Sequence, residues 1–482
     1  MSVYSLRDRI EAPGEWWLPE APERKISGTL ICTPNDASRL DLLETFRPPT
    51  GVLPSCLSEK YGLIYGVTRD GEAVTVVSPQ RQGWSFHFGS GGARQPETVI
   101  SSLLFMGAHV SPGAVFEEMS FRIPGLAIWW SRPIIEQSTS KDAQGHLEWS
   151  CRVRQPREDA IRVPTSGLSV RLEFSINTAA DPFTSARVDT AGWINLRPTT
   201  PQRVDWYLQE FRKISMILAF TAGCPMSADC IEAPTGEPHR ALSVIVALRD
   251  AVYCLYKDEH EFFMRHSTMG VHLSEVVVRW FDTFPRVEAP SQLAMSVLAS
   301  NDLWLHVEFL SLMQALEGLH RGVVGGDYMD KETYEPVRQV LSAAIPGALA
   351  AAHKEALSSR IKWGYQYSLR KRLEDLAGRL CTPIRQVIFG DNGCLPQRWV
   401  TTRNFFTHWD EQERTEALHG AELYYANVRM RHFLRALYLE LMGIPQDTIL
   451  ASLHSTGRVA QQLAALNGGV LGRIDELNSD SR

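Results

Sequence analysis

The stretch NDLWLHVEFLSLMQALEGLHRG, residues 301–322, indicates the fold class of the second half of the chain. Apolar side chains recur in it at helical spacing: Leu305, Phe309, Leu312, Leu316 and Leu319. Residues three or four apart lie on one face of an α-helix, so these side chains form a stripe that a helix can bury. Gly322 follows the stripe and is a helix-terminating residue. The stretch therefore predicts an amphipathic helix that packs against other elements.

More helical patterns follow along the chain. Residues 334–357 and 368–380 have them, the first interrupted at Pro346. A long helix is predicted from about Thr402 to Met442, ended by Gly443 and Pro445. Its apolar residues are spaced by four, three and four: Met430, Leu434, Leu437 and Leu441. Residues 291–445 are therefore predicted to form an all-α bundle, and 446–482 a C-terminal tail with one weak helix.

The chain before residue 290 has a different pattern. GLIYGVTRDGEAVTVVSP, residues 62–79, alternates on both sides of Arg69-Asp70-Gly71, which indicates a β-hairpin because glycine supplies the positive φ of the turn. Residues 121–130 and 167–177 continue the strand pattern, and 204–223 have helical spacing. The predicted fold class is α+β multidomain. A large β-rich N-terminal domain, residues 1–290 with some helix after residue 204, precedes the all-α bundle.

Composition excludes several classes of function. The net charge of −6 over 482 residues shows no overall basic excess. No two of the eight cysteines form a C-x-x-C pair, which argues against a zinc site. H-E-x-x-H, P-loop and G-x-S-x-G motifs are absent, and no cofactor or metal is expected. The N-terminus has no apolar core and no apolar run approaches the roughly 20 residues of a membrane span. We expect a soluble, cytoplasmic protein.

The sequence RNFFTH, residues 403–408, combines side chains that suit phosphodiester chemistry. A histidine titrates near neutral pH and can move a proton, whereas an arginine stays charged and binds a phosphate through two parallel hydrogen bonds. Cleavage of RNA through the 2′-hydroxyl needs a proton moved and negative charge neutralised on the phosphoryl oxygens. Arg403 and His408 supply both functions, and Asn404 adds an uncharged hydrogen-bonding group.

The five-residue spacing is weak by itself. A second Arg and His with that spacing, Arg414 and His419, occur inside the predicted long helix and are interpreted as an accidental match. In an ideal helix, residues five apart point about 140° away from each other. Arg403 and His408 can face one ligand only if Arg403 lies at a frayed or capped helix start, which the preceding Thr401 and Thr402 would provide.

RNFFTH resembles the R-N-x-x-x-H signature of HEPN domains, helical bundles found in many metal-independent ribonucleases of conflict and defence systems. The stretch FLSLMQALEGLHR, residues 309–321, resembles the first helix of such domains, with Glu317 at the acidic position. SLRKRLEDL, residues 368–376, resembles a middle helix. A large β-rich domain ahead of the bundle is similar to the order of parts in ApeA-like anti-phage HEPN proteins.

The resemblance implies a role for each matching residue. Arg403 would bind and stabilise the scissile phosphate, and His408 would act as general acid or base. Asn404 would orient the phosphate or the histidine, and Glu317 would hold the arginine or histidine from a neighbouring helix. Such domains usually act as homodimers with two motifs facing each other. The products would be a 2′,3′-cyclic phosphate and a 5′-hydroxyl.

A plainer interpretation stands beside each of these. Arg403 and His408 can belong to a solvated helix start, and Glu317 can be an ordinary surface carboxylate. Residues 354–403 carry ten Lys or Arg against four Asp or Glu, a local net charge of +6. Four of these residues are candidate RNA contacts: Lys362, Arg370, Lys371 and Arg372. A run of like charges is also typical of a solvated helix face.

The leading hypothesis is an endoribonuclease in anti-phage defence that cuts host RNA, with transfer RNA as one implied substrate. The N-terminal domain would sense a phage-derived trigger and restrain the bundle. The alternatives are a non-catalytic HEPN protein that binds a nucleotide or a partner, and the toxin of a toxin–antitoxin pair.

Overall fold

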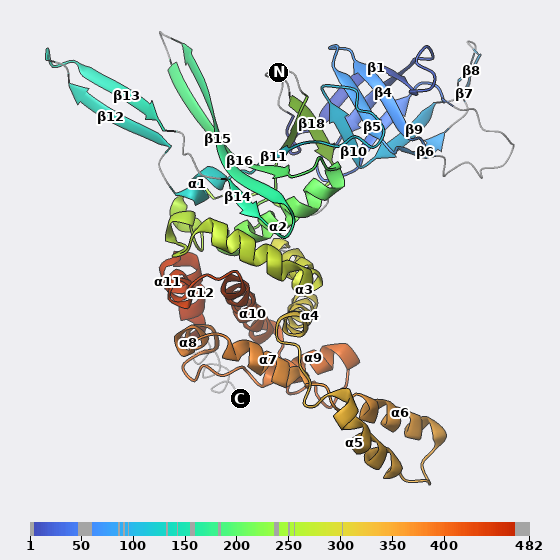
Figure 1. The fold of residues 1–482 in the computed structure, drawn as a ribbon, viewed down its shortest axis with the longest axis vertical. Coiled ribbons are helices and arrows are strands. Elements are labelled where there is room, and N and C mark those ends of the chain that lie inside the picture. The colour runs from blue at the N-terminus through green and yellow to red at the C-terminus, as the bar shows by residue number, and fades with distance from the viewer. Residues whose placement is uncertain are drawn as a thin grey trace, which may run out of the picture. The chain divides into compact units, whose positions relative to one another are not determined.

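The computed structural model describes residues 4–467 apart from 47–59, 85–86, 90–91, 95, 132–133, 142, 155–159, 182–184, 236–240, 249–250, 255 and 301. Contacts divide the chain into two compact units. The β unit comprises Met1–Thr268 and His272–Val278, and the helical unit comprises Met269–Val271 and Arg279–Arg482. The predicted fold class, a β-rich part followed by an all-α bundle, is confirmed (Figure 1).

The β unit is built on one antiparallel sheet of 14 strands. Their order across the sheet is β14-β15-β16-β11-β17-β18-β10-β5-β4-β1-β2-β3-β9-β6. The first seven along the chain are β1 (Ile10–Trp17), β2 (Ile26–Cys32), β3 (Ser38–Leu42), β4 (Leu63–Thr68), β5 (Ala73–Val77), β6 (Gln80–Trp84) and β9 (Glu97–Ser101). The other seven are β10 (Leu103–Met106), β11 (Met119–Arg122), β14 (Ile161–Val163), β15 (Leu168–Asp181), β16 (Ser185–Pro198), β17 (Cys230–Pro234) and β18 (Ala241–Val246).

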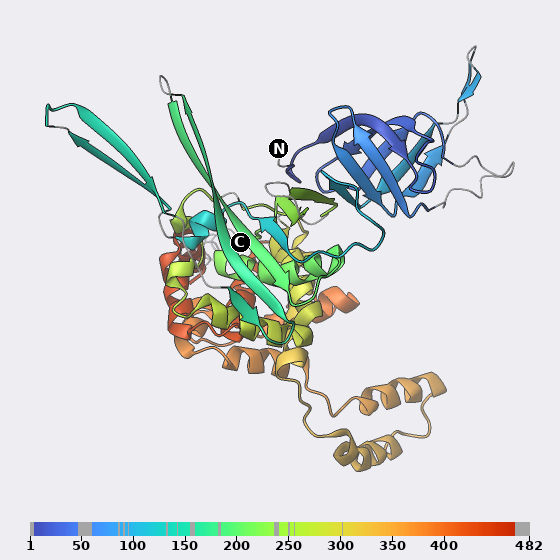
Figure 2. The ribbon, with the colours of Figure 1, turned by 45° about the horizontal axis from the view of Figure 1, so that its top comes forward.

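The predicted hairpin over residues 62–79 is confirmed as β4 and β5. Val67 pairs with Ala73, and Gly71 between them has φ of 82°. Figure 2 shows the strands from β1 to β6 curling together at one end of the β unit. Trp16 of β1, Leu30 of β2 and Leu104 of β10 are fully buried. Alternation along the strands therefore places one set of side chains inside, as the sequence pattern indicates.

Residues 121–130 do not form one strand. β11 ends at Arg122, and after Gly125, whose φ is 84°, the chain forms the short helix α1 (Leu126–Trp130). The indole of Trp129 donates a hydrogen bond to the Met264 carbonyl (3.0 Å), and Trp130 stacks on His266 with ring centroids 3.9 Å apart. Both tryptophans are fully buried, so they pack the core.

Helix α2 (Val204–Ala222), predicted from its spacing, covers part of the sheet. Phe211 on α2 stacks on Phe121 of β11 with ring centroids 4.1 Å apart. The Tyr207 hydroxyl donates to the Phe116 carbonyl at 2.6 Å. Two short 3₁₀ turns, η1 (Glu259–Glu261) and η2 (His266–Thr268), follow further along the chain.

Four strands belong to two separate ribbons. They are β7 (His87–Gly89) with β8 (Gly92–Arg94), and β12 (Ile135–Lys141) with β13 (Leu147–Val153). Figure 2 shows β12 and β13 extending beyond the rest of the β unit. Leu147 and Trp149 on β13 are exposed, so this ribbon presents apolar side chains that the unit itself does not cover.

The helical unit contains most of α3 (Leu273–Ala299) and the helices that follow it. These are α4 (Leu305–Val323), α5 (Lys331–Ala343), α6 (Ala351–Lys362), α7 (Leu369–Gly378), α8 (Thr382–Phe389), α9 (Arg398–His408), α10 (Gly420–Leu441), α11 (Gln446–Ser455) and α12 (Gly457–Asn467). The predicted boundary after residue 290 falls inside α3, because this helix continues through Pro285 and Pro290. The segment after residue 446 holds two helices rather than one.

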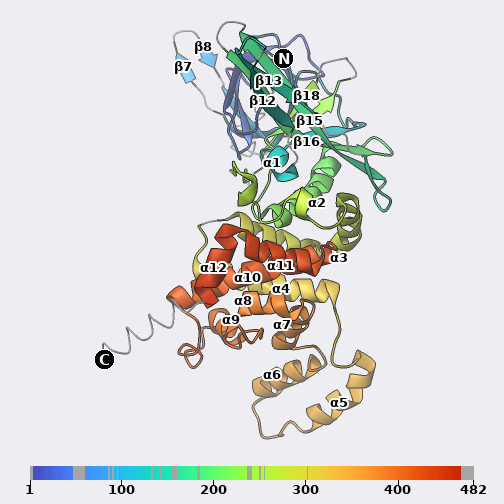
Figure 3. The same cartoon turned by 90° about the vertical axis from the view of Figure 1, so that its left-hand side faces the viewer.

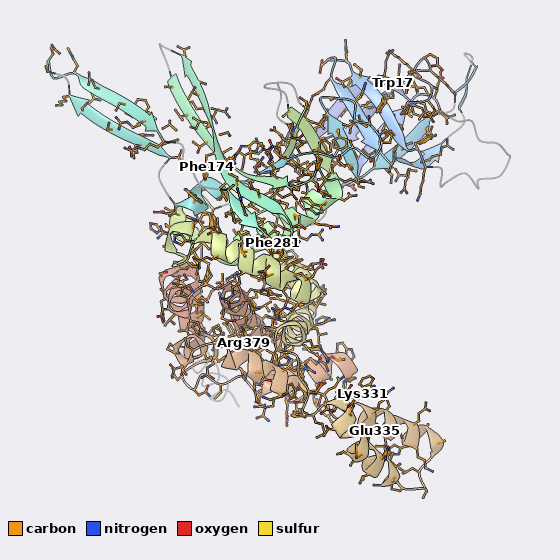
Figure 4. All side chains as sticks on the ribbon, in the orientation of Figure 1. Trp17, Phe174, Phe281, Lys331, Glu335 and Arg379 are labelled. Carbon is orange, nitrogen blue, oxygen red and sulfur yellow. The ribbon has the colours of Figure 1, made fainter. Side chains whose placement is uncertain are left out.

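The stripe predicted from residues 301–322 lies in the core of the helical unit. Phe309, Leu312, Leu316 and Leu319 on α4 are fully buried. α4 packs against α10, α7 and α9. α4 is thus the central helix, and the helices that carry the candidate residues are arranged around it. Arg379, labelled in Figure 4, also joins this unit by a bidentate ion pair with Glu440 of α10 at 2.7–3.0 Å.

The long helix predicted from Thr402 to Met442 is two helices. α9 ends at His408, and Trp409 after it has a left-handed backbone with φ of 55°. Asp410 accepts a hydrogen bond from the Gln412 amide (3.0 Å) in the turns that follow, and Gly420 begins α10 with φ of 50°. The apolar stripe from Met430 to Leu441 lies wholly within α10. It therefore predicts a helix for α10 but gives no information about the secondary structure before Gly420.

Helices α5 and α6 form a pair at one end of the helical unit (Figure 3). The chain enters and leaves this pair through an isolated β-bridge between Asp327 and Gln366, beside which the Tyr328 amide donates to the Tyr365 carbonyl (2.7 Å). Asp330 caps α5 by accepting a hydrogen bond from Thr333 (2.8 Å). The pair replaces the single interrupted helix expected over residues 334–357.

Candidate functional site

Helix α9 carries three of the four predicted catalytic residues. Its buried face consists of Trp399, Thr402, Phe405 and Phe406. The Thr402 hydroxyl accepts a hydrogen bond from the Leu418 amide at 2.9 Å, so the chain after α9 folds back onto the helix. Arg403, Asn404 and His408 lie outside the buried face.

The prediction that Arg403 lies at the start of a helix is wrong. α9 begins at Arg398, so Thr401 and Thr402 are inside the helix and Arg403 is near its middle. Thr402 is buried and uses its hydroxyl on Leu418 rather than as a cap. A helix that begins directly after the 390–397 loop leaves no frayed turn at Arg403.

Arg403 is held on one side by Glu317 of α4. The Arg403 Nη2 and Glu317 Oε2 atoms are 3.9 Å apart, and the arginine side chain is 33% exposed. Glu317 also accepts a hydrogen bond from Arg321 one turn along α4 (2.9 Å). The structure therefore brings Glu317 and Arg403 together across two helices and leaves part of the guanidinium open to solvent.

Asn404 links two faces of α9. It accepts a hydrogen bond from Arg403 Nη1 (3.4 Å). Residues four apart share a helix face, so Asn404 lies on the face of His408, whereas Arg403 shares its face with Thr407. The Thr407 hydroxyl donates to the Arg403 carbonyl (2.7 Å). Because the helix is regular between Arg403 and His408, these two side chains leave it about 140° apart.

His408 is the last residue of α9 and is exposed. Among the residues that the structure describes, it forms no hydrogen bond and no ion pair. Trp409, also exposed, ends the helix by donating its backbone N–H to the Phe405 carbonyl (2.6 Å). An imidazole in this position is free to approach a ligand from solvent or from another molecule.

A buried polar cluster lies beside Glu317, and sequence reasoning missed its central residue. His320, fully buried, comes one turn after Glu317 on α4. Its Nε2 lies 3.3 Å from Asp375 Oδ2, and its Nδ1 lies 3.1 Å from Arg372 Nη1. Lys371 forms a short ion pair with Asp375. The one signal in the sequence was a titratable residue directly after Leu319 of the apolar stripe.

Burial controls the charge states in this cluster. Burial lowers the pKa of His320, and the hydrogen bond to Asp375 opposes this only in part. Burial raises the pKa of Asp375, but the hydrogen bonds from Lys371 and His320 outweigh it and hold that pKa below its usual value. A neutral imidazole that donates from Nε2 to Asp375 and accepts at Nδ1 from Arg372 fits both contacts.

The four predicted RNA contacts separate into two groups. Lys362 is exposed and lies over the Trp363 ring, with Nζ 5.2 Å from the centroid. Arg370 and Lys371 are partly exposed and paired with Glu374 and Asp375. Arg372, by contrast, is only 2% exposed, because its guanidinium points into the cluster around His320. It is therefore not on the surface with the other three.

Other ligand types find little support in the described part of the chain. It contains no group of three or more His, Cys, Asp or Glu side chains placed to hold a metal ion. The thiols of Cys224 and Cys254 lie 3.4 Å apart although their sequence spacing indicated no pair. None of the described helices is long and apolar enough to span a bilayer.

Comparison with known families matches both units. The family described as ApeA N-terminal domain 1 matches residues 11–246, and the family described as Apea-like HEPN matches residues 310–448. No curated protein and no solved structure matches the chain. The second match includes α9 with Arg403, Asn404 and His408, and the part of α4 with Glu317. The chain therefore belongs to the ApeA-like HEPN proteins.

Proposed function

We propose that this protein is an endoribonuclease of anti-phage defence that cuts RNA with Arg403 and His408. The observation that carries the proposal is the partly exposed Arg403 guanidinium, held by Glu317 and Asn404. On the same helix lies an exposed His408, for which the described residues supply no hydrogen-bond or ion-pair partner. A cation and a proton-transferring group are what RNA cleavage through the 2′-hydroxyl needs.

In the proposed reaction, the 2′-oxygen attacks the neighbouring phosphorus, and the bond from phosphorus to the 5′-oxygen breaks. The 2′-hydroxyl loses its proton and the departing 5′-oxygen gains one, with His408 accepting or donating one of these protons. Arg403 stabilises the negative charge on the phosphoryl oxygens, and Asn404 orients the phosphate or His408. The products are a 2′,3′-cyclic phosphate and a 5′-hydroxyl, and no metal ion takes part.

Two copies of the chain would complete the site. Arg403 and His408 leave a regular α9 about 140° apart, so one copy cannot direct both side chains at one phosphate. In a symmetric dimer with two α9 helices facing each other, His408 of one copy would meet the phosphate held by Arg403 of the other. The exposure of His408 and Trp409 at the end of α9 supports this arrangement.

The β unit would restrain the helical unit until infection. A cell must keep a nuclease that acts on its own RNA, transfer RNA among it, inactive between infections. The exposed Leu147 and Trp149 on the β12–β13 ribbon support a contact with a phage-derived trigger, because exposed apolar side chains on a projecting ribbon suit a protein partner.

Plaque counts test this function. Cells carrying the wild-type gene, Arg403→Ala or His408→Ala at matched protein levels are infected, and their small RNA is separated on a gel. Protection and RNA fragments should disappear in both variants. Arg414→Ala and His454→Ala are the controls, because Arg414 is exposed and pairs only locally with Glu411, and His454 is exposed on α11.

Protection that persists in both site variants would reject the nuclease and favour a protein that binds a nucleotide or a partner. Toxicity of the wild-type chain that appears only when a neighbouring gene is deleted would favour the toxin of a toxin–antitoxin pair.

A further inference from the structure

Aromatic and cationic side chains alternate where the α5–α6 pair joins the rest of the helical unit. We call this the aromatic surface and define it as Tyr328, Lys362, Trp363, Tyr367 and Lys371. Trp363 is 50% exposed and Tyr328 is 55% exposed. Aromatic rings with this exposure leave apolar surface in contact with water, and the folded chain does not bury that surface.

The cations of this surface are placed over or beside the rings. Lys362 Nζ lies 5.2 Å from the Trp363 centroid, and Lys371 Nζ lies 5.5 Å from the Tyr367 centroid. Tyr328 meets Tyr367 edge to face, with centroids 4.9 Å apart. Rings with ammonium groups close to them offer a nucleotide both a base-stacking face and a phosphate contact.

The backbone holds the rings in place. The Asp327–Gln366 bridge and the hydrogen bond from the Tyr328 amide to the Tyr365 carbonyl join the two chain segments that bear them. The Tyr334 hydroxyl donates to the Ile361 carbonyl (2.6 Å), which fastens α5 to the end of α6 just before Trp363. The surface is therefore part of a fixed junction rather than of a free loop.

The aromatic surface lies close to the candidate catalytic residues. The rings of Tyr367 and His320 are 6.1 Å apart, and His320 is one helical turn from Glu317, which contacts Arg403. An RNA strand with its phosphate at Arg403 would thus have this surface within reach of nearby nucleotides.

We propose that the aromatic surface binds an unpaired segment of the RNA substrate, with a base stacked on Trp363 and phosphates at Lys362 and Lys371. The proposal rests on the proposed ribonuclease function and adds that the substrate is single-stranded next to the cut. Bases in a duplex are stacked on each other and cannot meet a protein ring, so the surface selects loops and single strands.

Fluorescence anisotropy on full-length His408→Ala protein, which should bind RNA without cutting it, tests the proposal. The probes are a labelled 12-nucleotide uridine strand and a labelled duplex of the same length. Trp363→Ala should weaken binding of the strand about tenfold and of the duplex less than twofold, whereas Trp363→Phe should keep most of the affinity. Tyr424→Ala is the matched control, because Tyr424 on α10 is 48% exposed and belongs to neither the aromatic surface nor the candidate site.

Salt dependence separates stacking from charge. Trp363→Ala should leave the slope of log affinity against log salt unchanged, and Lys362→Gln should reduce it by about one unit. Tyr328→Ala, expected to weaken strand binding as well, provides a second test if Trp363→Ala does not fold.

Equal losses for strand and duplex, no loss in either variant, or no RNA binding at all would overturn the proposal, and the last result would point to a protein partner. Single-strand binding that depends on Trp363 in a protein whose wild type cuts no RNA would reject the proposed function and keep this inference. RNA cleavage that is equally fast with and without the Trp363→Ala substitution would reject this inference and keep the proposed function.

Discussion

The Glu317 carboxylate of α4 lies 3.9 Å from the Arg403 guanidinium of α9 and 2.9 Å from that of Arg321. One carboxylate thus faces two arginines on two helices. Glu317 lies beside Nη2 of the Arg403 guanidinium, and Asn404 accepts a hydrogen bond from Nη1 at 3.4 Å. These contacts leave one edge of the Arg403 guanidinium open, and the proposed mechanism places the phosphate there.

Glu317→Gln should lower the rate of RNA cleavage roughly tenfold with little change in substrate affinity, because the amide holds Arg403 without a charge. Stability should change by less than about 1 kcal/mol, since the pair is partly exposed. Cleavage kinetics and thermal melting measure the two effects. Glu374→Gln, which breaks the exposed pair with Arg370, serves as the control. Equal cleavage losses in both variants would argue against a positioning role for Glu317.

Mixing two inactive variants should restore activity if each site uses two copies. A dimer of one Arg403→Ala chain and one His408→Ala chain has one site with both intact residues and one with neither. Random pairing makes half of all dimers mixed, so about a quarter of wild-type activity should return. The measurement is RNA cleavage after the two purified proteins are mixed and exchanged, with each variant alone as the reference.

A mixture no more active than its components would show that one copy holds the whole site. In that case α9 would have to unwind near His408 on binding RNA, because its regular form directs the two side chains apart.

Periodicity in the sequence predicted the fold correctly where a single apolar pattern covered a single helix or hairpin. The predicted stripe became the buried face of α4 from Phe309 to Leu319, with Leu305 partly exposed, and the alternation around Gly71 became the β4–β5 hairpin. Periodicity failed at residues 402–442, because the apolar stripe of α10 reports nothing about where the preceding helix ends. That end depends on the left-handed backbone of Trp409, a conformation no side-chain pattern reveals.

The candidate site was predictable in composition and not in geometry. The motif supplied Arg403, Asn404 and His408, and the helix resemblance supplied Glu317, whose contact with Arg403 depends on how α4 packs on α9. Arg372 was grouped with its neighbours by charge alone, and only packing shows that it turns inward to His320. Whether a helical residue is exposed depends on the face of the helix it occupies. Consecutive residues along α7 are rotated by about 100° about the helix axis, so neighbours in the sequence can differ in burial.

The helical unit should lose stability as the pH falls below about 6.5. Burial, aided by the nearby charge of Arg435, lowers the pKa of His432 on α10 to about 3. The unfolded histidine takes up a proton near pH 6.5 while the folded one stays neutral, so its contribution is present above that pH and is lost as the pH falls toward the folded pKa. Between pH 6.5 and 5 the loss should reach about 2 kcal/mol.

Thermal melts of wild type, His432→Phe and His454→Gln at pH 7.5 and 5.0 measure this effect. The pH-dependent drop should be smaller in His432→Phe and unchanged in His454→Gln, because His454 is exposed. Some drop should remain in His432→Phe, since burial also lowers the pKa of His320. A drop of the same size in all three proteins would assign the acid sensitivity to other groups.

Arg372→Ala should destabilise the helical unit by about 2 kcal/mol, whereas Arg370→Ala two residues earlier should stay within about 0.5 kcal/mol. Removing the buried guanidinium leaves His320 Nδ1 without its donor and opens space beside Tyr367, whose ring centroid is 6.0 Å from the guanidinium. Arg370 loses only a surface pair with Glu374. Urea unfolding of the two variants compares the costs directly. Similar small losses in both variants would mean that the Arg372 guanidinium reaches solvent and lies on the surface with Arg370.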